Sequence, residues 1–234
     1  MGIAERKSRE REERHKLILE KAKELILEKG VDALNMQEIA EACELSKATL
    51  YLYFENKESL LAEILDEAAD SFCSFVESRI EPGASGIEAL RTAWASHLAM
   101  FGESQDIIVL TGIMRAVDPA AFLAFGDGIP AVRGAATRLR SLISGILVRG
   151  MEDGTLLPGL DPERLTRTVI LIATSVIDAV ARLPREARDV RVVMEELRGI
   201  FEILLRGVAA PGTDHALLEL APGGNRAGPE RRRP

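Results

Sequence analysis

The sequence predicts an all-α fold in which a compact three-helix unit at the N-terminus precedes a longer helical body. Apolar residues recur at three- and four-residue intervals through most of the 234 residues, which is the spacing of amphipathic helices. Gly and Pro residues interrupt this pattern, and no alternating strand pattern or hairpin turn lies between them. Two short, capped segments between residues 35 and 57 indicate a helix-turn-helix within the N-terminal unit.

The expected helices follow in chain order from a charged arm at residues 1–13. Helix one ends at Lys29 and has an apolar stripe that includes Ile18, Ala22 and Ile26. The further helices are expected at Met36–Cys43, Lys47–Phe54, from Asn56 to the break at Pro82, Ser85–Gly102, Gln105–Ala116, Pro130–Glu152, Asp161–Leu183 and Glu186–Val208. These patterns divide the chain into an N-terminal unit at 1–55, a helical body at 56–208 and a Gly- and Pro-rich tail at 209–234 that is expected to be disordered.

Charge and cysteine content restrict the class of protein. The formal net charge is -7, and residues 1–60 contain eleven Lys and Arg against thirteen Asp and Glu. Bulk charge alone therefore argues against nucleic-acid binding, although a few placed cations suffice for a small footprint. Cys43 and Cys73 lie in apolar helical contexts and are expected to be buried free thiols. The charged N-terminus and the absence of a long apolar span predict a cytoplasmic protein without a membrane partner.

The helix-turn-helix is predicted from its caps and its apolar spacing. Asn35 is a suitable N-cap for the first helix, and Ser46 for the second. Leu50 and Phe54 lie four residues apart and face inward. The outward positions of the second helix offer donors to phosphates or base edges from Lys47, Thr49, Tyr51 and Tyr53, whereas Ala48 and Leu52 suit only a thymine methyl or space filling. The simpler alternative is a helical hairpin with a tyrosine-rich surface.

The segment Ser46–Leu60, S-K-A-T-L-Y-L-Y-F-E-N-K-E-S-L, resembles the recognition helix of the TetR family of transcriptional regulators. Gly30, Asn35 and Ile39-Ala40 fit the same motif, which covers residues 14–62. The resemblance implies a homodimeric repressor that binds a palindromic double-stranded DNA operator and is released by a small effector. It places Lys47, Ala48, Thr49 and Leu52 near bases. The remaining expected DNA contacts, mainly to the backbone, are Asn35, Gln37, Ser46, Tyr51, Tyr53 and Lys57.

Two residues depart from the family pattern. Glu44 occupies a turn position where the family often has Gly, and a left-handed conformation there would cost a non-Gly residue about 1 kcal/mol. Glu55 places a negative charge beside the expected phosphate contacts. The motif as a whole still matches.

Two apolar seams near the C-terminus indicate an antiparallel helix pair. Their members recur at heptad-like spacing and are Leu165, Val169, Ile172 and Val176 in one helix and Val193, Leu197, Ile200 and Leu204 in the next. The TetR resemblance implies that such a pair forms the dimer interface. A purely intrachain core is the alternative.

Large apolar residues in the middle of the chain define the expected effector site. The resemblance implies a pocket in this region, and the side chains suit an apolar or aromatic ligand. The candidates are Trp94, His97, Met100, Phe101, Ile113, Met114, Phe122 and Phe125, with Thr174 and Asp178 as further polar contacts. Plain core is the simpler interpretation of each residue taken singly.

No enzyme motif is found in the sequence. The three histidines, His15, His97 and His215, are scattered, and there is neither a phosphate-cradling Gly-rich loop nor a metal-binding HExxH pair. The chain is therefore not expected to be an enzyme or to need a cofactor. An all-helical enzyme and a helical adaptor without DNA binding are the competing classes.

Overall fold

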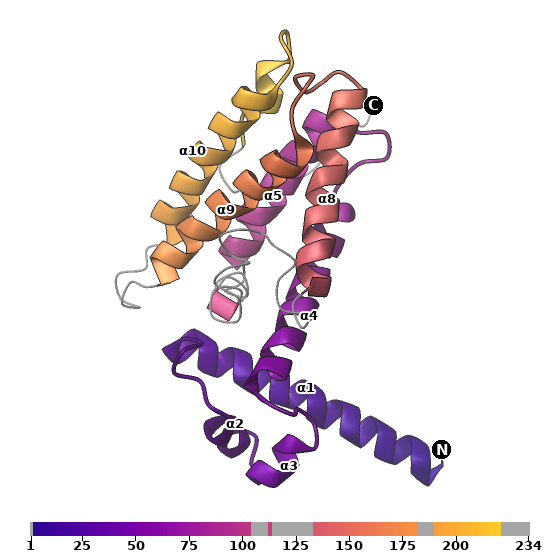
Figure 1. Ribbon diagram of the computed structural model, residues 1–234, viewed down its shortest axis with the longest axis vertical. Helices are drawn as coiled ribbons and strands as arrows, with labels where there is room; N and C mark the ends of the chain where they lie inside the picture. Colours follow the sequence, from indigo (N-terminus) through magenta and orange to yellow (C-terminus); the bar gives the residue numbers. More distant parts are fainter. Residues whose placement is uncertain (1, 104–111, 114–132, 182–189, 221–234) are drawn as a thin grey trace, which may run out of the picture.

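A computed structural model describes residues 2–103, 112–113, 133–181 and 190–220. Within those ranges the regular elements are helices, and the expected all-α fold is confirmed. The elements are α1 Ile3–Lys29, α2 Met36–Ala42, α3 Lys47–Tyr51, α4 Lys57–Glu77, α5 Gly86–Glu103, α8 Arg133–Glu152, α9 Pro162–Ala181, α10 Val190–Val208 and a short 3-10 helix, η3, His215–Leu218. Helices α1–α3 form a head at one end of the molecule, and α4 rises from it into a body made of α5, α8, α9 and α10 (Figure 1).

The head is held by an apolar core between α1, α2, α3 and the first half of α4. Ile18, Ile39, Leu50, Leu60 and Ile64 are all completely buried in it. The four-residue spacing of Ile18, Ala22 and Ile26 in the α1 stripe predicts that they face this core, and all three are buried. Helix α1 begins at Ile3, so most of the charged arm is a helical extension.

The turn between α2 and α3 contains an unfavourable backbone conformation. Glu44 has φ 56° and is the one non-glycine residue with positive φ in the described part of the chain. Its neighbours fix that conformation, because the backbone N–H of Leu45 donates to the carbonyl of Ala40 at 2.8 Å. Glu44 is therefore left-handed. This conformation costs a non-Gly residue about 1 kcal/mol of free energy relative to a right-handed one.

Helix α4 belongs to both hydrophobic cores. Its N-terminal half, from Leu60 to Ala69, lies in the head core, whereas Phe72, Cys73 and Val76 lie in the body core. Ion pairs link it to a helix of each part: Lys23 of α1 pairs with Glu67 at 3.1 Å, and Arg138 of α8 pairs with Asp70 at 2.7 Å. Both cysteines are buried and free, as expected, and burial raises the pKa of the Cys73 thiol to about 11.

The body is closed at its far end by a tight contact between α5 and α8. Gly86 and Gly150 meet so closely that a Cβ on Gly86 would lie 2.0 Å from the Cα of Gly150. The residues after α8 cap α5: the backbone N–H of Gly86 donates to Asp153 Oδ2 at 2.7 Å, and that of Ile87 donates to Thr155 Oγ1 at 3.1 Å. Because both residues are glycines and have no Cβ, the end of α8 can lie directly against the N-terminus of α5.

The segment after α10 differs from the sequence-based expectation. A disordered tail from residue 209 was predicted, but residues 209–220 fold back over the body, with Leu218 and Leu220 buried in its core. Arg91 donates to the carbonyl of Glu219 at 3.0 Å, and the N–H of Leu220 donates to Glu202 at 2.9 Å. The burial of two leucines and the two hydrogen bonds to backbone groups outweigh the tendency of the local Gly and Pro residues toward disorder. Residues 221–234 lie outside the described part.

No helix in the described ranges is long and apolar enough to cross a membrane.

Candidate functional site

The second helix of the helix-turn-helix is positioned by its cap and by its buried residue. The Ser46 hydroxyl accepts from the N–H of Thr49 at 3.1 Å, and this satisfies one of the free donors at the start of α3. Leu50 is completely buried and anchors the helix in the head core. Helix α3 ends at Tyr51, earlier than the expected Phe54, and the chain continues through a turn in which Phe54 is still buried.

The outward face of α3 exposes the residues expected to read bases. Lys47 and Ala48 are exposed, Leu52 is 74% exposed and Tyr51 45% exposed. Thr49 is half-buried, and its hydroxyl lies 2.8 Å from that of Ser46. The four exposed side chains lie within about two turns, so one short helix presents an ammonium, a phenol and two apolar groups on the outside of the head (Figure 1).

Several expected DNA contacts also have partners inside the protein. The side-chain oxygen of Asn35 accepts from the N–H groups of Gln37 and Glu38, both at 3.0 Å, so this residue caps α2. Lys57 donates from Nζ to the carbonyl of Val31 at 2.7 Å. Substitution of either residue would therefore perturb the head itself. Gln37 is exposed, and its amide donates to Glu41 at 2.6 Å.

The contacts of His15 with Phe54 and Glu63 were not predicted from the sequence. The His15 ring stacks on Phe54 at 4.9 Å between centroids, and its Nε2 lies 3.2 Å from Glu63 of α4. Arg11, one turn earlier, places its guanidinium 5.8 Å from the centre of the Tyr53 ring. Neither contact has a local sequence signal, because both join α1 to residues about forty positions later.

The expected effector residues on α5 form part of the body core. Trp94 is 4% exposed and stacks on Phe201 with 4.1 Å between centroids, while the His97 ring meets Phe72 and Phe201 edge-on. Met100 packs against the same core. The Nε1 atom of Trp94 and the Nε2 atom of His97 are buried and have no hydrogen-bond partner among the described residues. Burial lowers the pKa of His97 to about 4.

The other expected effector residues do not join this cluster in the described structure. Ile113 is completely buried, but in the head core, where its neighbour Gly112 lies against Val31. Its assignment beside Trp94 is therefore wrong: the segment between α5 and α8 reaches the head here. Met114, Phe122 and Phe125 lie outside the described residues, as do the side chains of Phe101, Thr174 and Asp178.

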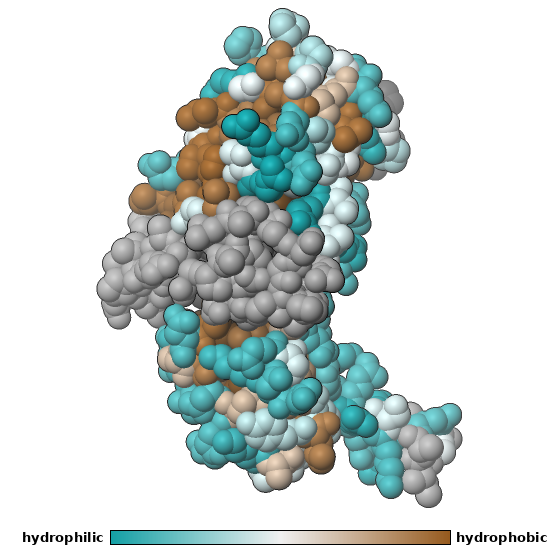
Figure 2. Space-filling view, in the orientation of Figure 1, coloured by the Kyte–Doolittle hydropathy of each residue, from teal (hydrophilic) through white to brown (hydrophobic). Residues whose placement is uncertain are grey.

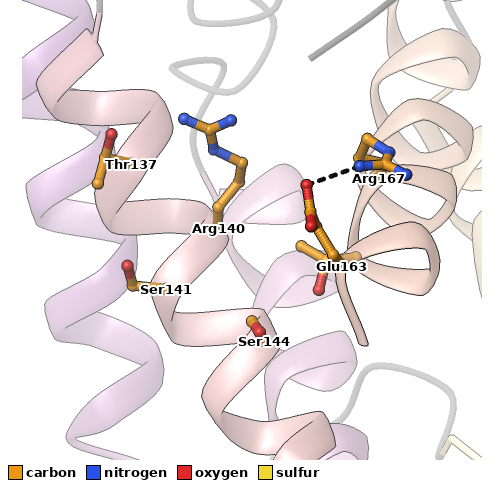
Figure 3. A pocket seen from close by; sticks show the side chains of 7 residues that line it. Thr137, Arg140, Ser141, Ser144, Glu163 and Arg167 are labelled. Atoms are coloured by element: carbon orange, nitrogen blue, oxygen red, sulfur yellow. Dashed lines mark hydrogen bonds and ion pairs between the residues drawn. The ribbon is translucent and has the colours of Figure 1, made fainter. Parts of the chain in front are cut away.

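A polar pocket that the sequence analysis did not identify lies between α8 and α9. It has a volume of about 440 Å³ and is lined by Thr137, Arg140, Ser141, Ser144, Glu163, Thr166 and Arg167. Figure 3 shows the α8 side chains on one wall and the Glu163–Arg167 ion pair, 2.8 Å long, on the other. The buried hydroxyl of Thr166 has no hydrogen-bond partner in the described part of the chain. A sequence signal existed, because Thr137, Ser141 and Ser144 recur at helical spacing.

Most of the predicted dimer seam packs inside the chain. Val169, Val193 and Leu197 are at most 6% exposed and lie in the body core, so these members of the predicted dimer interface pack within the chain. Leu165, Val176, Ile200 and Leu204 are partly buried against that core, and Ile172 is half-buried. The heptad-like spacing was correct for a buried stripe, but spacing alone does not distinguish an intrachain partner from a second copy.

A different face of α10 is open. Val192 is 54% exposed and Ile203 66% exposed, and an added Cβ on Gly199 or Gly207 would meet open space. Residues 192, 199 and 203 share one side of the helix because they lie seven and four positions apart. Figure 2 shows brown, apolar surface on the left of the upper part of the molecule, where α10 runs.

Comparison with known proteins identifies the family. The model of the bacterial regulatory proteins of the tetR family matches residues 18–64, which span the C-terminal part of α1, both helices of the helix-turn-helix and the start of α4. The chain belongs to the TetR family of transcriptional regulators. It is accordingly a DNA-binding transcriptional regulator with a helix-turn-helix head.

Relatives of this TetR-family chain extend the likeness beyond the head. The fatty acid metabolism regulator protein of Bacillus subtilis (strain 168) is 25% identical over 154 residues, which are 65% of this chain and 75% of that protein. The fatty acid degradation regulator FadR from Bacillus halodurans has a TM-score of 0.67 at 19% identity, with 83% of this chain and 95% of that chain covered. AibR, in complex with isovaleryl coenzyme A and operator DNA, has a TM-score of 0.58 at 22% identity, with 80% and 97% covered. The two structures share the fold.

The partly buried His97, whose Nε2 atom is buried, predicts a specific pH dependence of stability. Unfolding returns its pKa from about 4 to its ordinary value near 6.5, so the unfolded state takes up a proton in this range while the folded state does not. The free energy of unfolding should fall as the pH drops from 6.5 to 4, by up to about 3 kcal/mol from this group. In urea unfolding at a series of pH values, His97→Gln should show a shallower fall over that window. Equal slopes for wild type and variant would show that His97 is solvated.

Proposed function

We propose that this TetR-family chain is a repressor that binds a two-fold symmetric operator as a homodimer and leaves it when an acyl-bearing effector binds the body. The exposed face of α3 supports operator reading by Lys47, Ala48, Thr49 and Leu52. Tyr51, Tyr53, Gln37 and Lys57 surround that face and are proposed to hold the phosphate backbone. Ser46 and Asn35 keep the two helix starts in position through their caps.

The proposed dimer forms through the exposed face of α10 together with α9. Two copies would bury Val192 and Ile203, whose exposure is unfavourable in an isolated chain. Gly199 and Gly207 leave room for the helix of a second copy to approach closely. Of the residues expected from the sequence, Ile172, Ile200 and Leu204 keep enough exposure to take part.

The proposed effector is a coenzyme A thioester of a fatty acid or a similar apolar acid. Relatives named for fatty acid metabolism and an AibR complex with isovaleryl coenzyme A support this class. Within this chain, the pocket between α8 and α9 suits the phosphorylated part of such a ligand, because it combines two arginines with four hydroxyls. Glu163 pairs with Arg167 and lowers the positive charge of the pocket, but the lining keeps one net positive charge.

Coupling between effector and DNA is proposed to pass through α4 and the segment at Gly112–Ile113. Helix α4 belongs to both cores, and Ile113 lies in the head core beside it. An effector that prefers one arrangement of these elements weakens operator binding, and the operator weakens effector binding equally.

The operator contacts are tested by separating base reading from phosphate binding. Tyr51→Phe removes one hydroxyl and should weaken binding to every duplex by a similar factor, about fivefold for a single hydrogen bond. Lys47→Ala should instead change which base is preferred at one position, with a discrimination of about 1–3 kcal/mol. Selection from randomised duplexes followed by fluorescence anisotropy measures both effects, with Lys16→Ala on the far side of α1 as the control. Unchanged preference and affinity in both variants would refute the assignment of α3.

Dimerisation is tested by a charge on the open face of α10. Ile203→Asp should convert the protein to a monomer in analytical ultracentrifugation and lower operator affinity at least tenfold, because each head then binds without the second. Since Ile203 is 66% exposed in the chain, the fold should tolerate the change. Val148→Asp on α8, at a position 37% exposed, is the matched control and should remain dimeric. A wild-type monomer at micromolar concentration would contradict the proposal.

The effector class is tested by release of a labelled operator. A medium- or long-chain acyl coenzyme A should release the DNA, whereas free coenzyme A and the free fatty acid should do so only at much higher concentration. Arg167→Gln should shift the acyl coenzyme A response by about tenfold, the size expected for removal of one charged hydrogen bond, without changing operator affinity. The control Arg164→Gln, one turn earlier on α9 and exposed, should respond like wild type. Equal potency of the free fatty acid would argue against the thioester.

A further inference from the structure

The first turns of α1 form a charged arm that projects beyond the head. Residues 5–14 are all exposed, and none of them is apolar. Figure 1 shows this part of α1 running away from the head, with the N-terminus at about the level of α3 in this view. Arg11 of this arm lies 5.8 Å from the centre of the Tyr53 ring, so the arm reaches the turn that follows α3.

The cations of this region fall into two sets. Arg6, Arg9 and Lys16 each pair with a carboxylate four residues away, namely Glu10 at 2.9 Å, Glu13 at 3.6 Å and Glu12 at 2.9 Å. Lys7, Arg11 and Arg14 make no ion pair within the described ranges. One set is neutralised locally, and the other keeps its charge for a partner.

The unpaired set shares one face of the helix. Lys7, Arg11 and Arg14 are spaced by four and three residues, and Ile18 follows Arg14 by four, so all four side chains lie along one line. Ile18 is completely buried in the head core, which fixes the direction of that line toward the other helices of the head. The position of Arg11 over the Tyr53 ring, 5.8 Å from its centre, agrees with this direction.

We propose that Lys7, Arg11 and Arg14 bind the phosphates of the operator outside the segment read by α3. This inference rests on the proposed operator binding and extends it to a second, flanking site. Tyr53 is a proposed phosphate contact, and Arg11 lies against it, so the two surfaces are continuous. Lys7 and Arg14 are about 10 Å apart along the helix, and duplex DNA carries one charge per about 1.7 Å of its axis, so the row faces several phosphates.

The experiment compares two triple variants that remove the same charge from the same helix. One, the row variant, changes Lys7, Arg11 and Arg14 to Gln, and the other, the paired-set variant, changes Arg6, Arg9 and Lys16 to Gln. Each is measured with the operator that wild type selects from randomised DNA, both in a 40-base-pair duplex and in a duplex trimmed to the segment protected by the head. Circular dichroism and thermal melting check that both variants keep the helix content and stability of wild type.

The row variant should bind the long duplex about tenfold more weakly than wild type near physiological salt. The slope of log affinity against log salt concentration should also become shallower, by about 0.9 for each phosphate that the row no longer neutralises. The paired-set variant should keep most of the wild-type slope, and wild type on the trimmed duplex should show the same reduction as the row variant. If the two variants lost affinity and salt slope equally, the effect would come from bulk charge rather than from the row, and the inference would be overturned. Failure of wild type to select any duplex would instead refute the operator proposal itself.

Discussion

The sharing of α4 between two hydrophobic cores constrains the whole molecule. Leu60 to Ala69 are buried with the head, and Phe72, Cys73 and Val76 are buried with the body. A continuous helix transmits rotation and translation along its length, because each turn is hydrogen-bonded to the next. The orientation of the head therefore depends on how the second half of α4 packs against α5 and α8. Ion pairs of Glu67 with Lys23 and of Asp70 with Arg138 link α4 to α1 and to α8.

The parts of the fold that could be predicted from the sequence are those determined by neighbouring residues. Asn35 and Ser46 cap α2 and α3 through atoms two or three positions away, so local patterns located both helices. The left-handed turn residue was identified for the same reason, although Glu44 is not a glycine. The expected exposure of the α3 residues followed once Leu50 was assigned to the core.

The predictions that failed concern residues whose partners are distant in the sequence. The stripe through Val193 and Leu197 has the periodicity of a helix seam, but whether α5 or a second chain covers it depends on the three-dimensional arrangement. Ile113 has no sequence neighbour that points to the head core. Leu218 and Leu220 occur in a segment rich in Gly and Pro, and their burial depends on space left between α5 and α10. The polar pocket needs α8 and α9 side by side, so each half of its lining looks like an ordinary solvated face.

An acidic protein that binds DNA must separate its charges in space. The chain has a formal net charge of -7, yet Glu38, Glu63 and Glu67 of the head are engaged with cations. Glu63 and Glu67 lie on α4, where they contact His15 and Lys23 rather than the outer face of α3. Long-range repulsion from the body is reduced by salt screening over about 8 Å at physiological ionic strength. Local placement, rather than net charge, then decides whether the head can approach a duplex.

The burial of Ile113 in the head core also affects the order in which the protein folds during synthesis. The helix-turn-helix leaves the ribosome early, but its core includes the first half of α4 and a residue almost fifty positions beyond it. Domains generally fold as units while the chain elongates. This head can complete its packing only after the segment beyond α5 has also emerged. A nascent chain that stops short of that point carries the helix-turn-helix without Ile113 in the core beneath it.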